Sequence, residues 1–217
     1  LYISLKTAAV ATTLTFFAGI WLAYVVVRLR RFQGLIDALI TLPMVLPPTV
    51  VGFFLLLLFG KRSILGTFLL QFDIRFVFTW KAAVAAAVVV SLPLMYRTAR
   101  GAFESFDETL AWSGRTLGLS GTYIFWHIRM PYCKQGIIAG TVLAFARALG
   151  EYGATSMLIG YIPKNTATIS TTVYQLWRTN DEYSAFVWVL VNIAISAVVL
   201  LTVNMLEKRG QGRRACS

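Results

Sequence analysis

Two charged side chains, Arg147 and Glu151, lie four residues apart inside an otherwise apolar stretch of the sequence. On a helix this spacing places both on one face, where they can pair. A charged side chain at the centre of a membrane costs at least about 2.5–3.5 kcal/mol, and pairing offsets part of that cost. The pair is either a buried contact that fixes helix packing or part of a transport path, and both interpretations keep it away from lipid.

No other group of residues has the pattern of a catalytic or metal site. His127 is the single histidine, and Cys133 and Cys216 show neither metal-ligand spacing nor a disulfide framework. Residues 60–63 resemble part of a nucleotide-binding loop, but Leu55 stands where that loop requires glycine. The sequence therefore gives no support to an intramembrane enzyme, and we assign no catalytic residue.

The composition indicates that lipid is the solvent for much of this chain. Of its 217 residues 58% are hydrophobic and 13% are charged, whereas soluble domains are about 45–50% apolar and about 25% charged. The net charge of +11 comes from Lys and Arg beside the apolar runs, which is typical of membrane proteins and does not indicate a nucleic-acid partner.

The apolar runs predict an all-α polytopic fold in a single transmembrane domain, residues 1–217. Five stretches are long enough to span the bilayer: 7–27, 38–60, 76–96, 135–161 and 183–206. Positive residues follow the first and last spans, for example Arg28, Arg31 and Lys208, and they favour an N-terminus outside and a C-terminus inside.

The longest inner connection, about residues 97–134, mixes apolar and charged residues at helical spacing. We predict an amphipathic helix over residues 98–115, a break at Gly118 and Gly121, and a second short amphipathic stretch, 122–130, that ends at Pro131. Such a helix could lie on the lipid surface or dock a cytoplasmic partner, and the pattern alone does not separate these alternatives.

The second predicted span contains three prolines within six positions, Pro43, Pro47 and Pro48. Proline removes a backbone donor and kinks a helix, and freed carbonyls are tolerated in a membrane only where protein or water satisfies them. This region should therefore face a partner helix or a pathway.

The inner connection resembles the cytoplasmic motif of ATP-binding-cassette (ABC) import permeases, Glu-Ala-Ala-x3-Gly-x9-Ile-x-Leu-Pro. Gly118, Ile128 and Pro131 match its second half, with Met130 in place of Leu. The first half departs from the motif, because residues 112–114 are Trp-Ser-Gly. Glu108, one helical turn earlier, could replace the missing acid.

Two further segments resemble the molybdate permease subfamily, and the resemblance extends over about residues 4–207. Residues 145–155 read Phe-Ala-Arg-Ala-Leu-Gly-Glu-Tyr-Gly-Ala-Thr, and residues 42–52 match Leu-Pro-x3-Pro-Pro-x-Val-Val-Gly. Sulfate permeases share a similar fourth span but usually lack the Pro-Pro version of the second.

This resemblance implies a type I ABC importer permease with five transmembrane helices, assembled as a homodimer in the cytoplasmic membrane of a prokaryote. Two copies of a separate ATPase would bind its inner face and hold the ATP and Mg²⁺, so this chain would bind no cofactor. An extracytoplasmic binding protein would deliver molybdate. The alternatives are a tungstate or a sulfate/thiosulfate permease of the same type, and an ion-coupled secondary transporter.

The resemblance also implies two groups of functional residues. The ATPase-docking loop would comprise Glu104, Glu108, Trp112, Arg115, Leu117, Gly118, Leu119, Tyr123, Ile128 and Pro131. The translocation path or gate would comprise Pro47, Pro48, Thr49, Arg147, Gly150, Glu151, Gly153, Thr155 and Ser156.

Overall fold

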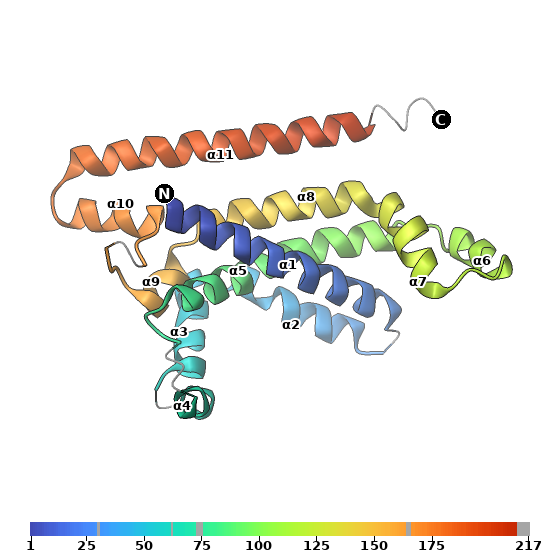
Figure 1. Ribbon diagram of the computed structural model, residues 1–217, viewed down its shortest axis with the longest axis horizontal. Helices are drawn as coiled ribbons and strands as arrows, with labels where there is room; N and C mark the ends of the chain where they lie inside the picture. The colour runs from blue at the N-terminus through green and yellow to red at the C-terminus, as the bar shows by residue number, and fades with distance from the viewer. Residues whose placement is uncertain (30, 62, 73–75, 164–165, 212–217) are drawn as a thin grey trace.

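The computed structural model describes residues 1–29, 31–61, 63–72, 76–163 and 166–211, and these residues form helices joined by short connections (Figure 1). Cys216 and Arg30 lie outside the described residues. The elements are α1 (Tyr2–Arg28), α2 (Gln33–Val45), α3 (Pro48–Phe59), α4 (Ile64–Gln71), α5 (Trp80–Glu104), α6 (Glu108–Thr116), α7 (Gly121–Ile124), a π-helical turn (Phe125–Arg129), α8 (Met130–Leu149), α9 (Gly153–Ile159), α10 (Ile169–Arg178) and α11 (Glu182–Gln211). The all-α prediction is confirmed for the described residues.

Helices α1, α5 and α8 run side by side and form the centre of the molecule (Figure 1). Small side chains allow this close packing, since Ala82, Ala83, Ala86 and Ala87 of α5 are all buried. One buried hydrogen bond, 3.1 Å between the hydroxyls of Thr15 and Ser91, joins α1 to α5. Helix α6 lies at one end of this bundle, and α3 and α9 lie toward the other (Figure 1).

Three of the described helices, α1, α5 and the first part of α11, are each long and apolar enough to cross a membrane. Helices α2 and α3 are long and apolar enough only when taken together, as one broken span or as a re-entrant loop. The predicted fourth span, 135–161, corresponds to α8 and α9. The sequence suggested one continuous helix there, but residues 150–152 separate the two helices. The count of five and the orientation with the N-terminus outside stay predictions.

The second span is broken at Pro47 and Pro48, where the axes of α2 and α3 differ by 111°, whereas Pro43 lies inside α2 without interrupting it. Leu46 precedes a proline and is extended, with ψ 143°, which agrees with the steric exclusion of the helical conformation at that position. Pro48 then opens α3 at its first turn, where the missing N–H is no loss. The predicted kink is confirmed.

The inner connection departs from its prediction at both ends. Helix α5 does not stop near residue 96 but continues to Glu104, and the single helix predicted over residues 98–115 is interrupted at residues 105–107. The second stretch does not end at Pro131 either. The chain passes from α7 through the π-helical turn into α8 without leaving helical geometry, and Pro131 occupies the first turn of α8, where proline is tolerated.

Helix α11 is the least covered of the long helices, since only 6% of its most apolar window is buried. It lies along the bundle at some distance from α1 and contacts α8 and α10 (Figure 1). Its exposed apolar side chains include Phe186, Leu190 and Ile193. A surface of this size and composition requires lipid or another protein against it.

Candidate functional site: a docking hairpin and two broken helices

The start of α6 is fixed by a side-chain cap. An Oδ1 of Asp107 accepts a hydrogen bond from the backbone N–H of Thr109 at 2.9 Å. Hydrogen bonding by Thr109, from its side chain first and its backbone N–H second, holds the pKa of the Asp107 carboxyl below its usual value, because it favours the charged form. The cap explains why the long predicted helix breaks here: α5 ends, the chain turns, and a new helix begins at Glu108.

The end of α6 is fixed by Gly118, which has φ +77°. The N–H of Gly118 bonds the carbonyl of Arg115 at 2.9 Å, and the N–H of Leu119 bonds that of Gly114 at 3.0 Å. These two hydrogen bonds form a Schellman motif, in which the residue with a left-handed backbone conformation is usually glycine. The N-cap of α7 follows at once, since Oγ of Ser120 accepts from the N–H of Tyr123 at 3.2 Å.

Helix α6 folds back onto the π-helical turn and forms a hairpin with it. Gly114 allows this approach, because a Cβ there would lie 3.2 Å from the side chain of Ile124. Arg129, with 5% of its side chain exposed, bonds the carboxylate of Glu108 at 2.5 Å and stacks 4.4 Å from the ring centre of Phe106. Glu108 therefore joins α6 to the π-helical turn within the hairpin, although 49% of its side chain is still exposed.

Other residues of the predicted docking loop form an exposed surface on this hairpin. Trp112 and Leu117 are 62% and 79% exposed, and Arg115, Gly118 and Tyr123 are also exposed. We call these five residues the docking face. Of the remaining predicted residues, Glu104 ends α5 and Pro131 lies in α8, both exposed, whereas Leu119 and Ile128 are partly buried against the core. Apolar side chains this exposed on a polar hairpin are typical of a surface that contacts lipid or another protein.

At the other end of the bundle, the broken second span meets the broken fourth span. A Cβ on Gly153, at the start of α9, would lie 2.9 Å from Cβ of Pro48 and 3.1 Å from the backbone N of Thr49. A Cβ on Gly52 of α3 would lie 2.7 Å from Cα of Ala154. The two segments predicted to line a path, far apart in the sequence, are therefore in backbone contact.

We expect Gly52→Ala to destabilise this contact by about 1–3 kcal/mol, the usual effect of overpacking. The added methyl group would meet backbone atoms of Ala154, which cannot rotate away. The measurement is the thermal midpoint of the detergent-solubilised protein by size-exclusion chromatography. Gly34→Ala is the matched control, since a Cβ there meets nothing within 4 Å, and equal midpoints for the two variants would contradict the close approach.

Arg147 and Glu151 form the predicted pair, with Nη1 2.6 Å from Oε2. The helix, however, ends at Leu149, so the expectation of one continuous helical face is wrong. The other oxygen, Oε1, accepts a hydrogen bond from the backbone N–H of Ala154 at 2.8 Å. Glu151 thus joins the end of α8 to the start of α9.

The pair is buried unequally: 2% of the Glu151 side chain is exposed, against 30% for Arg147. Oε2 of Glu151 lies close to Arg147 without hydrogen-bond alignment, and among the described residues it has no hydrogen-bond partner. The attraction is therefore mainly between charges, and it is stronger than between two exposed groups because the Glu151 side chain is buried.

The remaining predicted path residues lie in or beside the two broken spans. Gly150 caps α8 and is exposed, Thr155 is buried, and the hydroxyl of Ser156 donates to the carbonyl of Gly153 at 3.0 Å. Pro47 is exposed at the bend between α2 and α3. The structure therefore brings the predicted path residues into one region, where α3 packs against α9, and separates them from the docking face.

The sequence over residues 15–211 matches the family described as "Binding-protein-dependent transport system inner membrane component". The chain belongs to this family. The permease family expected from the motifs is thereby confirmed, and the chain is a multi-pass membrane protein.

Curated relatives of this family cover nearly the whole chain. The Escherichia coli (strain K12) molybdenum transport system permease protein ModB is 41% identical over 215 residues, 97% of this chain and 93% of the relative. The Salmonella typhimurium sulfate transport system permease protein CysT is 33% identical over 98% of this chain and 76% of its own length. A crystal structure of a bacterial alginate ABC transporter with a substrate-bound periplasmic protein matches with a TM-score of 0.77 at 16% identity, covering 96% of this chain and 77% of that one. The last likeness concerns the fold.

The sequence did not predict two ion pairs that the structure contains. Arg129 occupies the variable position between Ile128 and Met130 of the motif, and its bond to Glu108 spans 21 residues. Asp37 pairs with Arg100 across α2 and α5. In neither pair are the two residues close enough in sequence for helical spacing to indicate the contact. The one feature of the sequence that could have indicated a role for Asp37 is that it is an isolated acid after three arginines.

Proposed function

We propose that the chain is the permease subunit of an ABC importer that carries molybdate across the cytoplasmic membrane of a prokaryote. The observation that supports this most directly is the meeting of the two broken helices α3 and α9 beside the buried pair Arg147–Glu151. Interrupted helices expose backbone groups at membrane depth, which is tolerated only beside protein or a water-filled path.

The pathway would be completed by a second copy of the chain. One copy supplies one set of broken helices, and Arg147 remains 30% exposed next to them. Helix α11 also leaves most of its apolar surface uncovered. A symmetric dimer would place two such sets around one axis, as closed two-fold assemblies do.

The docking face would bind a separate ATPase at the cytoplasmic side. Its exposed Trp112, Leu117 and Tyr123 are the kind of apolar and aromatic residues enriched at protein interfaces. ATP and Mg²⁺ would be held by that ATPase, and hydrolysis would take place there. Closure of the ATPase dimer would draw the two hairpins together and open the path outward, and hydrolysis would reset it inward.

The path residues would make weak contacts to the transported oxyanion, because tight binding inside a path would prevent release. Thr49, Thr155 and Ser156 supply hydroxyl groups, and Arg147 supplies a positive charge at the break in the fourth span. A binding protein outside the membrane would deliver the anion. The proposal of molybdate follows the higher identity to the ModB relative, 41%, than to the CysT relative, 33%.

We expect proteoliposomes that contain the chain, its ATPase and its binding protein to accumulate labelled molybdate in the presence of ATP. Excess tungstate should compete strongly, since it is also a tetrahedral dianion of nearly equal size, and excess sulfate should compete at least about tenfold less well. Stronger competition by sulfate would reject the substrate. Uptake by the chain without any ATPase would reject the ABC mechanism.

A further inference from the structure

Helix α2 is attached to the rest of the molecule mainly along one edge. None of its residues is fully buried, and Ile36 and Ile40 are the partly buried side chains that reach the core. Asp37 lies between them in sequence, and its Oδ1 is 2.5 Å from Nη1 of Arg100 on α5. This ion pair is therefore the main charged contact that fixes α2 against the bundle within the described residues.

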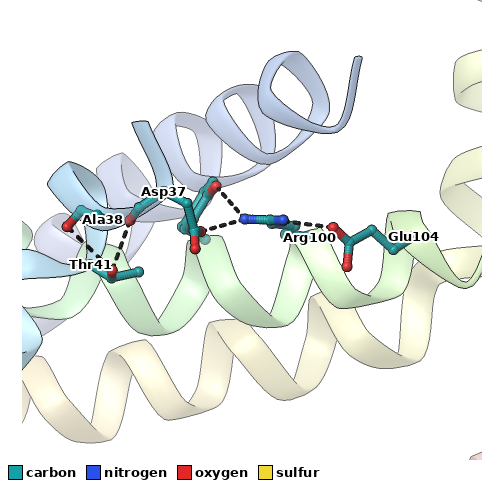
Figure 2. A network of polar contacts seen from close by, with 6 residues as sticks. Asp37, Ala38, Thr41, Arg100 and Glu104 are labelled. Atoms are coloured by element: carbon teal, nitrogen blue, oxygen red, sulfur yellow. Dashed lines mark hydrogen bonds and ion pairs between the residues drawn. The ribbon is translucent and has the colours of Figure 1, made fainter. Parts of the chain in front are cut away.

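Arg100 also binds a second acid at the same time. Its Nε donates to Oε1 of Glu104 at 2.7 Å (Figure 2). Its Nη1 donates to the hydroxyl of the buried Tyr96 at 3.4 Å. The guanidinium group lies between Asp37 and Glu104, with one edge toward each (Figure 2). Because the guanidinium is planar and rigid, a movement of one acid changes the geometry of its contact with the other.

Neither acid lies within the hairpin or among the path residues, but each is on an element that leads to one of these two regions. Glu104 is on α5, one turn after Arg100. Glu104 is the last residue of α5, and the cap of α6, Asp107, follows three residues later. Asp37 lies near the start of α2, and the other end of α2 is the bend that leads into α3. With 13 residues, α2 is about 20 Å long at 1.5 Å per residue, so it connects the ion pair near the end of α5 to the bend that leads toward the path.

We propose that Asp37, Arg100 and Glu104 form a positioning link that transmits movement of the docking hairpin through α2 to the bend at Pro47. This inference rests on the proposed function, since it requires an ATPase that moves the hairpin. Displacement of Glu104 shifts Arg100, Arg100 carries Asp37 with it, and α2 moves as a rod because its remaining surface is weakly held. The bend then changes the contact of α3 with α9, where the path residues lie.

The test measures molybdate transported per ATP hydrolysed in proteoliposomes that contain the assembled complex, for Asp37→Asn, Arg100→Gln and the double variant. We expect each single variant to lower this ratio by about tenfold while ATP hydrolysis continues. The double variant should be no worse than either single one, because residues of one linkage are not additive. Asp37→Glu keeps the carboxylate and should retain most of the ratio.

Thr41→Val is the matched control, since Thr41 lies one turn along α2 and its hydroxyl bonds the α2 carbonyls of Asp37 and Ala38 (Figure 2). Its ratio should equal that of the unmodified chain. The transport ratio is measured per assembled complex, so a lower yield of folded protein does not change it. The proposal would be overturned if Asp37→Asn and Arg100→Gln left the transport ratio unchanged. It would also be overturned if the double variant lowered the ratio by the product of the two single effects, because the pair would then be a packing contact only.

Failure of the proposed function has a different result. If the unmodified complex hydrolyses ATP and moves sulfate instead of molybdate, the substrate is wrong, and the same variants measured with sulfate still decide the link. If the unmodified chain transports without an ATPase, the link loses its source of movement and is overturned together with the ABC mechanism.

Discussion

Glu151→Ala is expected to reduce the amount of folded protein recovered from the membrane severely. The substitution leaves Arg147 without its counter-charge and removes the acceptor of the Ala154 N–H. Breaking a buried ion pair on one side costs about 3–5 kcal/mol, and loss of the Glu151 hydrogen bond that caps the first turn of α9 from one residue before its N-cap costs about 1 kcal/mol. Because Arg147 retains 30% exposure, the lower end of the first range applies, and the sum is still a large part of a typical folding stability of about 5–15 kcal/mol.

The double variant Arg147→Met/Glu151→Gln separates the lost charge from the lost cap. Glutamine still offers an oxygen to the N–H of Ala154, and methionine leaves no unpaired charge, so yield should recover to near that of the unmodified chain. Fluorescence-detected size-exclusion chromatography measures the yield, and uptake assays on the recovered protein then report whether the charges serve transport. A normal yield for Glu151→Ala would disprove the energetic role of the pair.

The sequence predicted a kink in the second span because proline acts through local backbone sterics, which do not depend on the rest of the fold. Leu46, Pro47 and Pro48 determine the bend by themselves. The size of the bend, 111°, was not predictable, because it depends on how α3 packs against α9. Spacing alone likewise found Arg147 and Glu151, but it did not show that α8 ends between them.

The contacts that connect segments distant in the chain could not be predicted from the sequence. Arg129 and Glu108, and Arg100 and Asp37, come together because helices pack in three dimensions, and no periodicity records such pairs. The single predicted helix over residues 98–115 was wrong for a related reason. The cap at Asp107 is a local signal, but the hydrophobic pattern continues across it and concealed it.

The turn at Gly118 carries the second large expected effect, since Gly118→Asp should uncouple ATP hydrolysis from transport. A residue with a Cβ at φ +77° is strained by about 1–2 kcal/mol. A Cβ there meets nothing within 4 Å, so the strain acts on the Schellman turn and not on packing. Distortion of this turn would move Leu117 relative to Trp112 on the docking face, and we expect molybdate uptake to fall at least tenfold while the ATPase remains active.

Two variants identify the cause of that loss. Gly121→Asp adds the same charge three residues away, at a glycine with ordinary φ and open space around its Cβ position, and it should leave uptake close to normal. Gly118→Asn has nearly the shape of the aspartate without its charge. If Gly118→Asn loses as much uptake as Gly118→Asp, distortion of the backbone turn causes the loss. If Gly118→Asn retains uptake, the added negative charge on the docking face causes it. Unchanged ATPase pull-down and unchanged uptake for Gly118→Asp would show that this turn takes no part in docking.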